Sequence, residues 1–290
     1  MITFKSLSEL TIKEMSDLWN NAFEGYYTNI KMPLERFVAR TVNEGLSFEH
    51  SFACYVGDEA AGIIMNGFRE SNGSTIAWNG GTAIVPQFRS QGVGQAMLQN
   101  NTEFYDRFGV EAAYLEAISH NQKAIHIYEK AGYELIEKLF VMSCEQMNPI
   151  ENTGSDRYQI AKGFPADVLT LAFYEPAEVW QAQWQSLKDG ASIIVYDQGE
   201  AVGFAQYRRT LGVSGVLSGI TLARCEAAPD REDGESIMLA ALQEIWRSEP
   251  DCKRAALNIR AKDHVLVDLL KRMNFETSIE QVLMRRTVVR

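Results

Sequence analysis

The sequence predicts an α/β protein that is built from two similar units. The chain has 290 residues, and a domain usually holds about 100–200 residues, so the length favours two domains. In the first half, segments that alternate like strands are interleaved with segments of helical periodicity. The order of residue classes in that half then recurs further along the chain. These three observations together predict a tandem α/β fold.

The internal repeat is clearest around a short loop motif. Residues 89–92 read RSQG, and residues 231–234 read REDG, at an offset of 142 positions. The same offset places Tyr133 on Phe275, with similar neighbours on both sides. Two homologous halves explain this agreement better than chance does.

The repeat divides the chain into two predicted domains, residues 1–148 and residues 149–290. The join is expected in residues 148–155, a short polar stretch with turn formers. Any chemistry is expected in the first of these domains, within residues 1–146.

Each element of the first half has a local signal. Apolar residues at helical spacing predict a helix over residues 10–23, and Pro33 opens a second over 34–45 in its first turn. The sequence Asn-Gly-Gly at 79–81 interrupts a strand over 75–85 and indicates a bulge or a splay. The face of the first helix comprises Ile12, Met15, Leu18, Trp19 and Ala22. The other predicted elements are strands over 51–56, 61–68, 112–118 and 133–144, and helices over 94–108 and 121–131, the last capped by Gly132.

Composition excludes several classes of protein. Hydrophobic residues make up 46% and charged residues 23% of the chain, which excludes a disordered, collagenous or coiled-coil protein. No apolar run approaches the roughly 18 residues that cross a bilayer, and no export signal is visible. Four widely spaced cysteines indicate reduced thiols in the cytoplasm, and neither they nor the histidines show metal-ligand spacing. The net charge of −10 argues against nucleic acid or an anionic membrane as partner and mildly favours cationic partners such as amines.

The loop in residues 84–98 is a candidate anion cradle. A strand ends there, Gly92 and Gly94 allow a sharp turn, and an apolar-periodic helix begins. Successive N–H groups and the helix N-terminus attract a phosphate, to which Arg89 can add a full positive charge. A dinucleotide-binding loop is disfavoured because Met97 stands where the third glycine belongs. The alternative is a plain strand–helix turn with glycines for geometry.

A second informative segment covers residues 114–133. Glu116 lies at the centre of a largely apolar predicted strand, where a carboxylate is costly unless it is paired, hydrated or used. Asn121 is well placed as a helix N-cap. Tyr128, seven residues later, faces the same side of that helix, either as a core aromatic or as a functional phenol.

The two segments together resemble the GCN5-related N-acetyltransferase (GNAT) family. Residues 89–94 are similar to its R/Q-x-x-G-x-G/A motif, and residues 121–133 to its N-x-x-A-x-x-x-Y-x-x-x-G-F/Y motif. The resemblance covers most of residues 1–146. It implies two tandem GNAT-like domains, each a mixed, mostly antiparallel, splayed sheet flanked by helices, and acetyl-CoA as the co-substrate.

The resemblance also implies roles for individual residues. Amides of residues 91–95, assisted by Arg89, would hold the diphosphate of the donor, and the end of the preceding strand would bind the pantetheine arm. Tyr128 matches the acid that protonates the leaving thiolate. Glu116 matches a residue that deprotonates the amine directly or through water, or it is structural. The implied donor-binding residues are Ile84, Val85, Arg89, Ser90, Gln91, Gly92, Val93, Gly94, Gln95, Asn121 and Tyr128. Tyr26 and Tyr27 are expected to line the acceptor pocket or to pack in a surface loop.

The second half looks like a degenerate copy. Its loop carries four carboxylates, on Asp230, Glu232, Asp233 and Glu235, whereas residues 87–95 carry none. A carboxylate near a phosphate is repulsive, by about 4 kcal/mol at 4 Å and an effective dielectric constant of 20. The offset also replaces Glu116, Asn121 and Tyr128 by Asn258, Asp263 and Leu270. This half is predicted to keep the fold without binding the donor, and it could shape the acceptor cleft, form a subunit contact or remain as a stabilising remnant.

The leading hypothesis is a cytoplasmic N-acetyltransferase that moves an acetyl group from acetyl-CoA to a primary amine by direct attack. The acceptor is a small molecule or a peptide; polyamines, aminoglycosides, small amines and basic peptide termini fit equally. No metal, nucleic acid or membrane is expected to take part, and a homodimer is compatible with the sequence. The alternative is a non-catalytic acyl-CoA-binding or interaction module on the same tandem scaffold.

Overall fold

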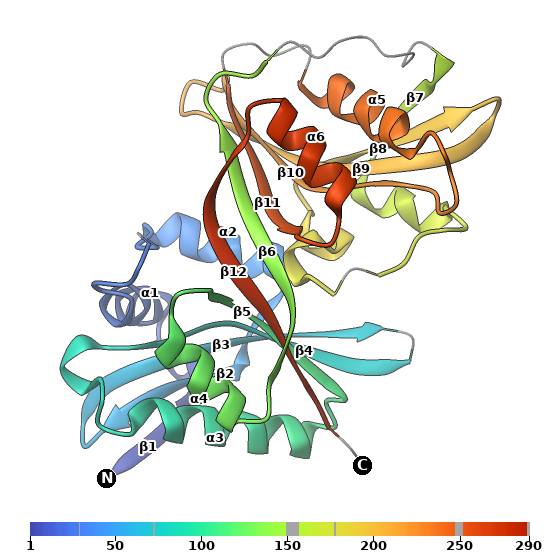
Figure 1. Cartoon of the computed structure of the whole chain (residues 1–290). Helices are drawn as coiled ribbons and strands as arrows, with labels where there is room; N and C mark the ends of the chain where they lie inside the picture. The colour runs from blue at the N-terminus through green and yellow to red at the C-terminus, as the bar shows by residue number, and fades with distance from the viewer. Residues whose placement is uncertain (29, 72, 149–156, 177, 247–251, 289–290) are drawn as a thin grey trace. The chain divides into compact units, whose positions relative to one another are not determined.

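The computed structural model describes residues 1–28, 30–71, 73–148, 157–176, 178–246 and 252–288 (Figure 1). The chain forms two compact units. Unit 1 comprises Met1–Ile136 and Val282–Arg290, and unit 2 comprises Glu137–Gln281. Within the described ranges, no helix is long and apolar enough to cross a membrane.

Unit 1 is a mixed sheet with helices on its faces. Its strand order is β1-β2-β3-β4-β5-β12; β1 to β4 pair antiparallel, and β5 pairs parallel to β4. The strands are β1 Ile2–Ser6, β2 Leu46–Val56, β3 Glu59–Ser71, β4 Ser74–Ile84, β5 Ala112–Ile118 and the end of β12 Glu276–Thr287. The helices are α1 Ile12–Ala22, α2 Leu34–Glu44, α3 Val93–Phe108 and α4 Gln122–Lys130, with short 3-10 turns at Leu7–Glu9 and Pro86–Phe88. The predicted fold class is confirmed, and β1 is the strand that sequence reasoning missed.

The first two helices begin and end on local capping signals. Thr11 accepts a hydrogen bond from the Glu14 amide, and the Glu14 carboxylate accepts one from the Thr11 amide, which forms a capping box. The predicted buried face of α1 is confirmed except at Ile12, which is 44% exposed because it lies in the first turn at the edge of the stripe. Pro33 was predicted in the first turn of α2, but it is the N-cap residue, and Gly45 ends the helix with φ +67°.

The middle of β4 departs from regular pairing, as the Asn-Gly-Gly sequence predicted. Met65 pairs with Gly81 and Asn66 with Asn79, so one residue of β4 bulges out of the ladder. The parallel ladder between β4 and β5 ends at the Trp78–Tyr114 pair. Beyond that pair, the described parts of the two strands no longer pair with each other, and the sheet is splayed there.

The core of unit 1 fixes the two helices that border this splay. Side chains from β3, β5, α3 and α4 pack together with the end of β12. Its most deeply buried members include Ala61, Met97, Tyr105, Leu115 and Met284. Because α3 and α4 pack on the same layer, the loops that precede them lie at the same edge of the sheet.

Unit 2 repeats the architecture of unit 1 with one local change. Its strand order is β6-β11-β10-β9-β8-β7, with the beginning of β12 beside β6. The elements are β6 Glu134–Cys144, β7 Gln159–Gly163, β8 Gly190–Asp197, β9 Glu200–Leu211, β10 Leu217–Ala227, β11 Lys253–Arg260, α5 Gly234–Trp246 and α6 His264–Arg272. Helix α6 is the counterpart of α4, because its bounds differ from those of α4 by the same 142 residues as the sequence repeat. Three short 3-10 turns, Pro165–Thr170, Trp180–Ala182 and Trp184–Ser186, stand where unit 1 has α1 and α2.

The last strands of the two sequence halves are exchanged between the compact units. Strand β6, from the first half, pairs with β11, for example Cys144 with Arg254. The end of β12, from the second half, belongs to unit 1, where Arg286 makes two hydrogen bonds of 2.8 and 3.0 Å to Asp106. The compact units therefore differ from the halves 1–148 and 149–290, which stay a prediction about the repeat, and most of the predicted join lies outside the described residues. All four cysteines are free thiols, and all four are buried.

Candidate active site

A cavity of about 380 Å³ opens in unit 1 where β4 leaves β5. It is bounded by Thr82 and Ile84 at the end of β4, by the loop before α3, and by α4. Eight of the predicted site residues line it: Tyr26, Tyr27, Ile84, Arg89, Ser90, Gly94, Asn121 and Tyr128. Among the residues that line it, Arg89 and Lys123 are cationic and none is a carboxylate. The cavity is therefore suited to an anionic ligand.

The loop before α3 presents backbone amides at this cavity. Gly92 is the N-cap residue with φ +80°, a conformation that favours glycine. The helical ladder begins with the bond from the Ala96 amide to the Gly92 carbonyl (3.1 Å), so the amides of Val93, Gly94 and Gln95 precede it. A Cβ at position 94 would lie 2.9 Å from Ile84 Cδ1, so a larger residue there would push against the end of β4. The geometry is that of an anion-binding helix N-terminus.

The Arg89 side chain is bonded to main-chain oxygens. Its Nε donates to the Ile84 carbonyl (2.9 Å), and its Nη2 donates to the carbonyls of Ala22 (3.0 Å) and Glu24 (2.5 Å). The guanidinium thus lies between the end of β4 and the end of α1. Sequence reasoning expected its charge at the diphosphate and did not foresee these acceptors.

Tyr128 presents its hydroxyl to the same cavity. The side chain is 9% exposed, and burial raises the pKa of its phenol, with the neighbouring Tyr26 phenol raising it further. The phenol hydrogen-bonds to Thr82, whose hydroxyl is also bonded to the Asn79 side chain (2.8 Å). Tyr128 is therefore neutral throughout the physiological pH range. The contribution of Thr82 could not be read from the sequence because it depends on the β4 bulge.

Asn121 joins α4 to the segment that follows α1. Its Oδ1 accepts from the Ala124 amide (3.2 Å), which confirms the predicted N-cap, and its side chain also hydrogen-bonds to the Tyr26 phenol. The Tyr27 ring lies 4.8 Å from the His120 ring, edge to face. Both tyrosines line the cavity, and His120 is a neighbour of Tyr27 that sequence reasoning missed.

Glu116 does not line this cavity. Its Oε2 accepts a hydrogen bond from the Trp78 indole (2.7 Å), while its Oε1 is buried and has no partner among the described residues. Burial raises the pKa of the carboxyl to about 7; Glu44 adds to the rise, and the Trp78 hydrogen bond and Arg40 oppose it. The structure thus places a carboxyl that titrates near neutrality beside the splay, with one free oxygen.

The corresponding loop of unit 2 is bonded to its own carboxylates. Arg231 makes two hydrogen bonds of 2.7 Å to Asp233, and Asp233 also accepts from the Tyr158 phenol (2.9 Å). Arg231 lowers the pKa of Asp233 to about 2. Asp197 bridges Arg231 to Arg157. The cation of this loop is therefore already neutralised.

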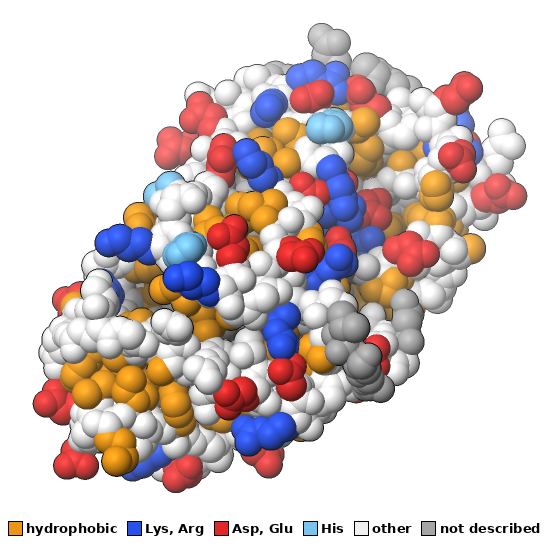
Figure 2. All heavy atoms as spheres, turned by 60° about the horizontal axis from the view of Figure 1, so that its bottom comes forward, with side chains coloured by type: hydrophobic (Ala, Val, Ile, Leu, Met, Phe, Trp, Pro, Cys, Tyr) orange, Lys and Arg blue, Asp and Glu red, His pale blue; other side chains and the backbone are white. Residues whose placement is uncertain are grey.

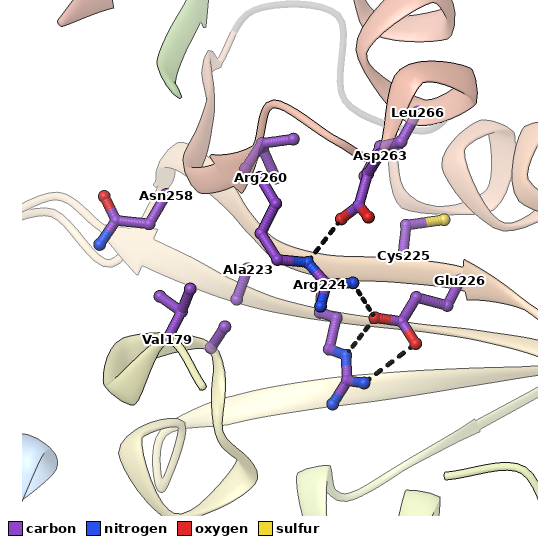
Figure 3. A pocket seen from close by; sticks show the side chains of 11 residues that line it. Val179, Ala223, Arg224, Cys225, Glu226, Asn258, Arg260, Asp263 and Leu266 are labelled. Carbon is purple, nitrogen blue, oxygen red and sulfur yellow. Dashed lines mark hydrogen bonds and ion pairs between the residues drawn. The ribbon is translucent and has the colours of Figure 1, made fainter. Parts of the chain in front are cut away.

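The slot of unit 2 that matches the unit 1 cavity is filled by charged side chains. Figure 3 shows Glu226 between two arginines: Arg224 donates to it at 2.6 and 2.9 Å and Arg260 at 3.3 Å, while Arg260 also donates to Asp263 at 2.9 Å. The remaining space is about 20 Å³, enough for roughly one water molecule. A ligand larger than a water molecule would have to break this network to enter the slot.

Comparisons with known proteins agree with this architecture. Residues 12–133 match the model of the Acetyltransferase (GNAT) family. A tandem GNAT protein from the clavulanic acid biosynthesis pathway aligns with 99% of this chain and 98% of its own at 12% identity, with a TM-score of 0.68. A GCN5-related N-acetyltransferase from Sphaerobacter thermophilus covers 99% and 95% at 15% identity and 0.67, and a putative acetyltransferase from Pyrococcus horikoshii covers 100% and 89% at 14% identity and 0.64.

No curated protein matches the chain. The solved structures show the fold alone, since all three are below 25% identity. A mixed α/β sheet flanked by helices, present in both units, is the fold that the chain shares with these acetyltransferase structures. Residues 12–133 thus match the GNAT family, and the chain as a whole shares the fold of tandem GNAT structures.

Proposed function

We propose that unit 1 transfers an acetyl group from acetyl-CoA to a primary amine of a small molecule or peptide by direct attack. The observation that carries this proposal is the convergence of three features on one cavity. The amides that precede the α3 ladder, the Asn121 side chain and the neutral Tyr128 phenol all meet where β4 and β5 part. An anion cradle beside a proton donor is what a CoA thioester requires.

The described residues fit the donor along the length of the cavity. Amides of residues 91–95 would hold the diphosphate, with Ser90 beside them, and Ile84, Val85 and Asn121 would hold the pantetheine arm. A second cavity of about 530 Å³ shares Leu98 and Ile127 with the first. It is lined by Gln95, Gln99, Lys130 and Arg286 among others and would take the nucleotide end.

The protein's own groups would move two protons. The amine must lose a proton before its nitrogen attacks the thioester carbonyl, and Glu116 would accept it through water, because its carboxyl has a pKa of about 7 but does not line the cavity. As the carbon–nitrogen bond forms and the carbon–sulfur bond breaks, Tyr128 would give its proton to the thiolate. Each such transfer is typically worth about 10²–10⁴ in rate, and holding the two reactants together supplies more.

Unit 2 would keep the fold without binding the donor. A reciprocal pair of variants tests this, because Gln91 and Asp233 occupy matching positions. Gln91→Asp is expected to weaken CoA binding at least about tenfold, since a carboxylate near the diphosphate costs more than the 1.4 kcal/mol of a tenfold change. Asp233→Gln should leave one CoA per chain, because the Arg224–Glu226–Arg260 network still fills the slot. Calorimetry gives both numbers, and a second equivalent bound in unit 2 would refute this role.

The proposal also covers the partners of the protein and its cellular compartment. An amine acceptor suits the net charge of −10. On the face shown in Figure 2, Lys and Arg side chains are interspersed with Asp and Glu, which gives no broad basic field for nucleic acid or an anionic membrane. The four free thiols are in keeping with the cytoplasm. A homodimer remains part of the proposal.

The deciding experiment measures thiol release from acetyl-CoA with a panel of amines, alongside CoA binding by calorimetry. Binding together with amine-dependent thiol release supports the enzyme. Binding without release for any amine, including polyamines, aminoglycosides and basic peptides, favours the alternative of a non-catalytic acyl-CoA-binding or interaction module. Absence of binding refutes both.

A further inference from the structure

The Arg89 guanidinium is the group that joins the loop before α3 to the end of α1. Three of its five N–H donors are used: Nε on the Ile84 carbonyl at 2.9 Å, and Nη2 on the carbonyls of Ala22 and Glu24 at 3.0 and 2.5 Å. The remaining nitrogen, Nη1, faces the same segment and lies 3.9 Å from the position of a Cβ on Gly25. The guanidinium is directed at the chain itself.

The two carbonyls belong to Ala22, the last residue of α1, and to Glu24, just beyond the C-cap residue. The last carbonyls of a helix have no amide to accept from, and a cation at a helix C-terminus is favourable. Gly25 then turns the chain with φ +66°, and Tyr26 and Tyr27 follow at the mouth of the cavity. Tyr26 is bonded to Asn121, and Tyr27 packs on His120. One side chain thus fixes a segment whose tyrosines close the cavity against α4.

We infer that Arg89 is a positioning residue that ties the acceptor-side segment, residues 22–27, to the donor loop. This inference rests on the proposed function, because a donor loop and an acceptor side exist only if unit 1 transfers an acetyl group. The attraction for the diphosphate then comes mainly from the amides that precede the α3 ladder and from Lys123, which lines the same cavity.

Lysine at position 89 separates the two roles. It keeps the positive charge, but its single nitrogen lacks the planar fork that reaches β4 and α1 at once. If charge at the diphosphate is the main role, Arg89→Lys should behave like the wild type. If the tie is the main role, Arg89→Lys should free the segment and leave donor binding largely intact.

The test compares wild type, Arg89→Lys and Lys123→Met by hydrogen exchange and by calorimetry with CoA. The reporters are the amides of Phe23, Glu24 and Tyr26, which donate to the main-chain carbonyls of Trp19, Asn21 and Phe23, respectively. Arg89→Lys is expected to raise their exchange rates at least about tenfold and to change the CoA dissociation constant less than about threefold. Lys123→Met should show the opposite pattern.

Unchanged exchange in Arg89→Lys overturns the inference, and so does a loss of CoA affinity of tenfold or more in that variant. The exchange measurement needs neither bound donor nor turnover. A wild-type protein that binds no CoA would therefore refute the proposed function while leaving the tie to be judged by exchange alone. If the amine panel identifies an acceptor, the KM for that acceptor should rise in Arg89→Lys, while the KM for acetyl-CoA should stay unchanged.

Discussion

Replacing Tyr128 by phenylalanine is expected to slow turnover by about 10²–10⁴-fold while leaving the CoA dissociation constant within about twofold. The change removes one hydroxyl from a side chain that otherwise keeps its packing in the core. Burial raises the pKa of this phenol, so it is protonated at every pH at which the enzyme would work. The same low-polarity surroundings raise the pKa of a departing thiolate, which keeps proton transfer from phenol to sulfur feasible.

Tyr133 provides the matched control for this experiment. Its ring lies 6.0 Å from that of Tyr128, and its buried hydroxyl has no hydrogen-bond partner among the described residues. Tyr133→Phe removes the same atom without touching the cavity, so turnover should be unchanged and stability equal or higher. Steady-state rates and calorimetry on both variants decide the matter. Equal turnover in Tyr128→Phe would remove this phenol from the mechanism.

Local sequence signals predicted the parts of the site that lie on single elements. Asn121 and Tyr128 share one helix, so their common direction follows from helical periodicity. Gly92 was expected at a turn that favours glycine, and it has φ +80°. The Asn-Gly-Gly sequence predicted the bulge that accompanies the splay of β4 from β5. In each case the cause lies within about ten residues of the effect.

What the sequence did not reveal depends on contacts between distant segments. The surroundings of Glu116 come from α2 and β4, through Arg40, Glu44 and Trp78, and no periodicity places those side chains together. The carbonyls that bind Arg89 are main-chain groups, which every residue carries. The exchange of β6 and β12 could not be predicted for another reason. The last strands of the two repeats are similar in sequence, so the sequence pattern is the same whichever sheet each strand joins.

Glu116→Gln is the second substitution with a large expected effect, and it should act on rate and stability in opposite directions. The wild-type kcat/KM is expected to rise with pH through about 7 as the carboxyl ionises. The glutamine cannot accept a proton, so the variant should lose that limb of the profile and about 10²-fold or more of the rate at pH 8. Its amide oxygen can still accept from the Trp78 indole.

The stability effect follows from the direction of the pKa shift. The pKa of Glu116 is about 7 in the folded chain against an ordinary value of 4.5, so the folded state holds the proton more tightly. The stability due to that proton is complete below pH 4.5 and is lost as the pH rises through 7. The variant escapes this loss, and its free energy of unfolding at pH 8 should exceed that of the wild type by about 1–3 kcal/mol. The two proteins should converge near pH 4.

Denaturant unfolding at pH 4 and pH 8, with the pH–rate profile of the same preparations, separates the roles of this carboxyl. Glu129→Gln, on the exposed side of α4, makes the same chemical change at the surface and should alter neither quantity. A gain in stability with an unchanged rate would make Glu116 a buried structural carboxyl and assign the proton from the amine to a water chain. A rate loss without the gain in stability would show that the pKa of the carboxyl is not raised in the folded protein, because the loss of stability at high pH follows from that shift alone.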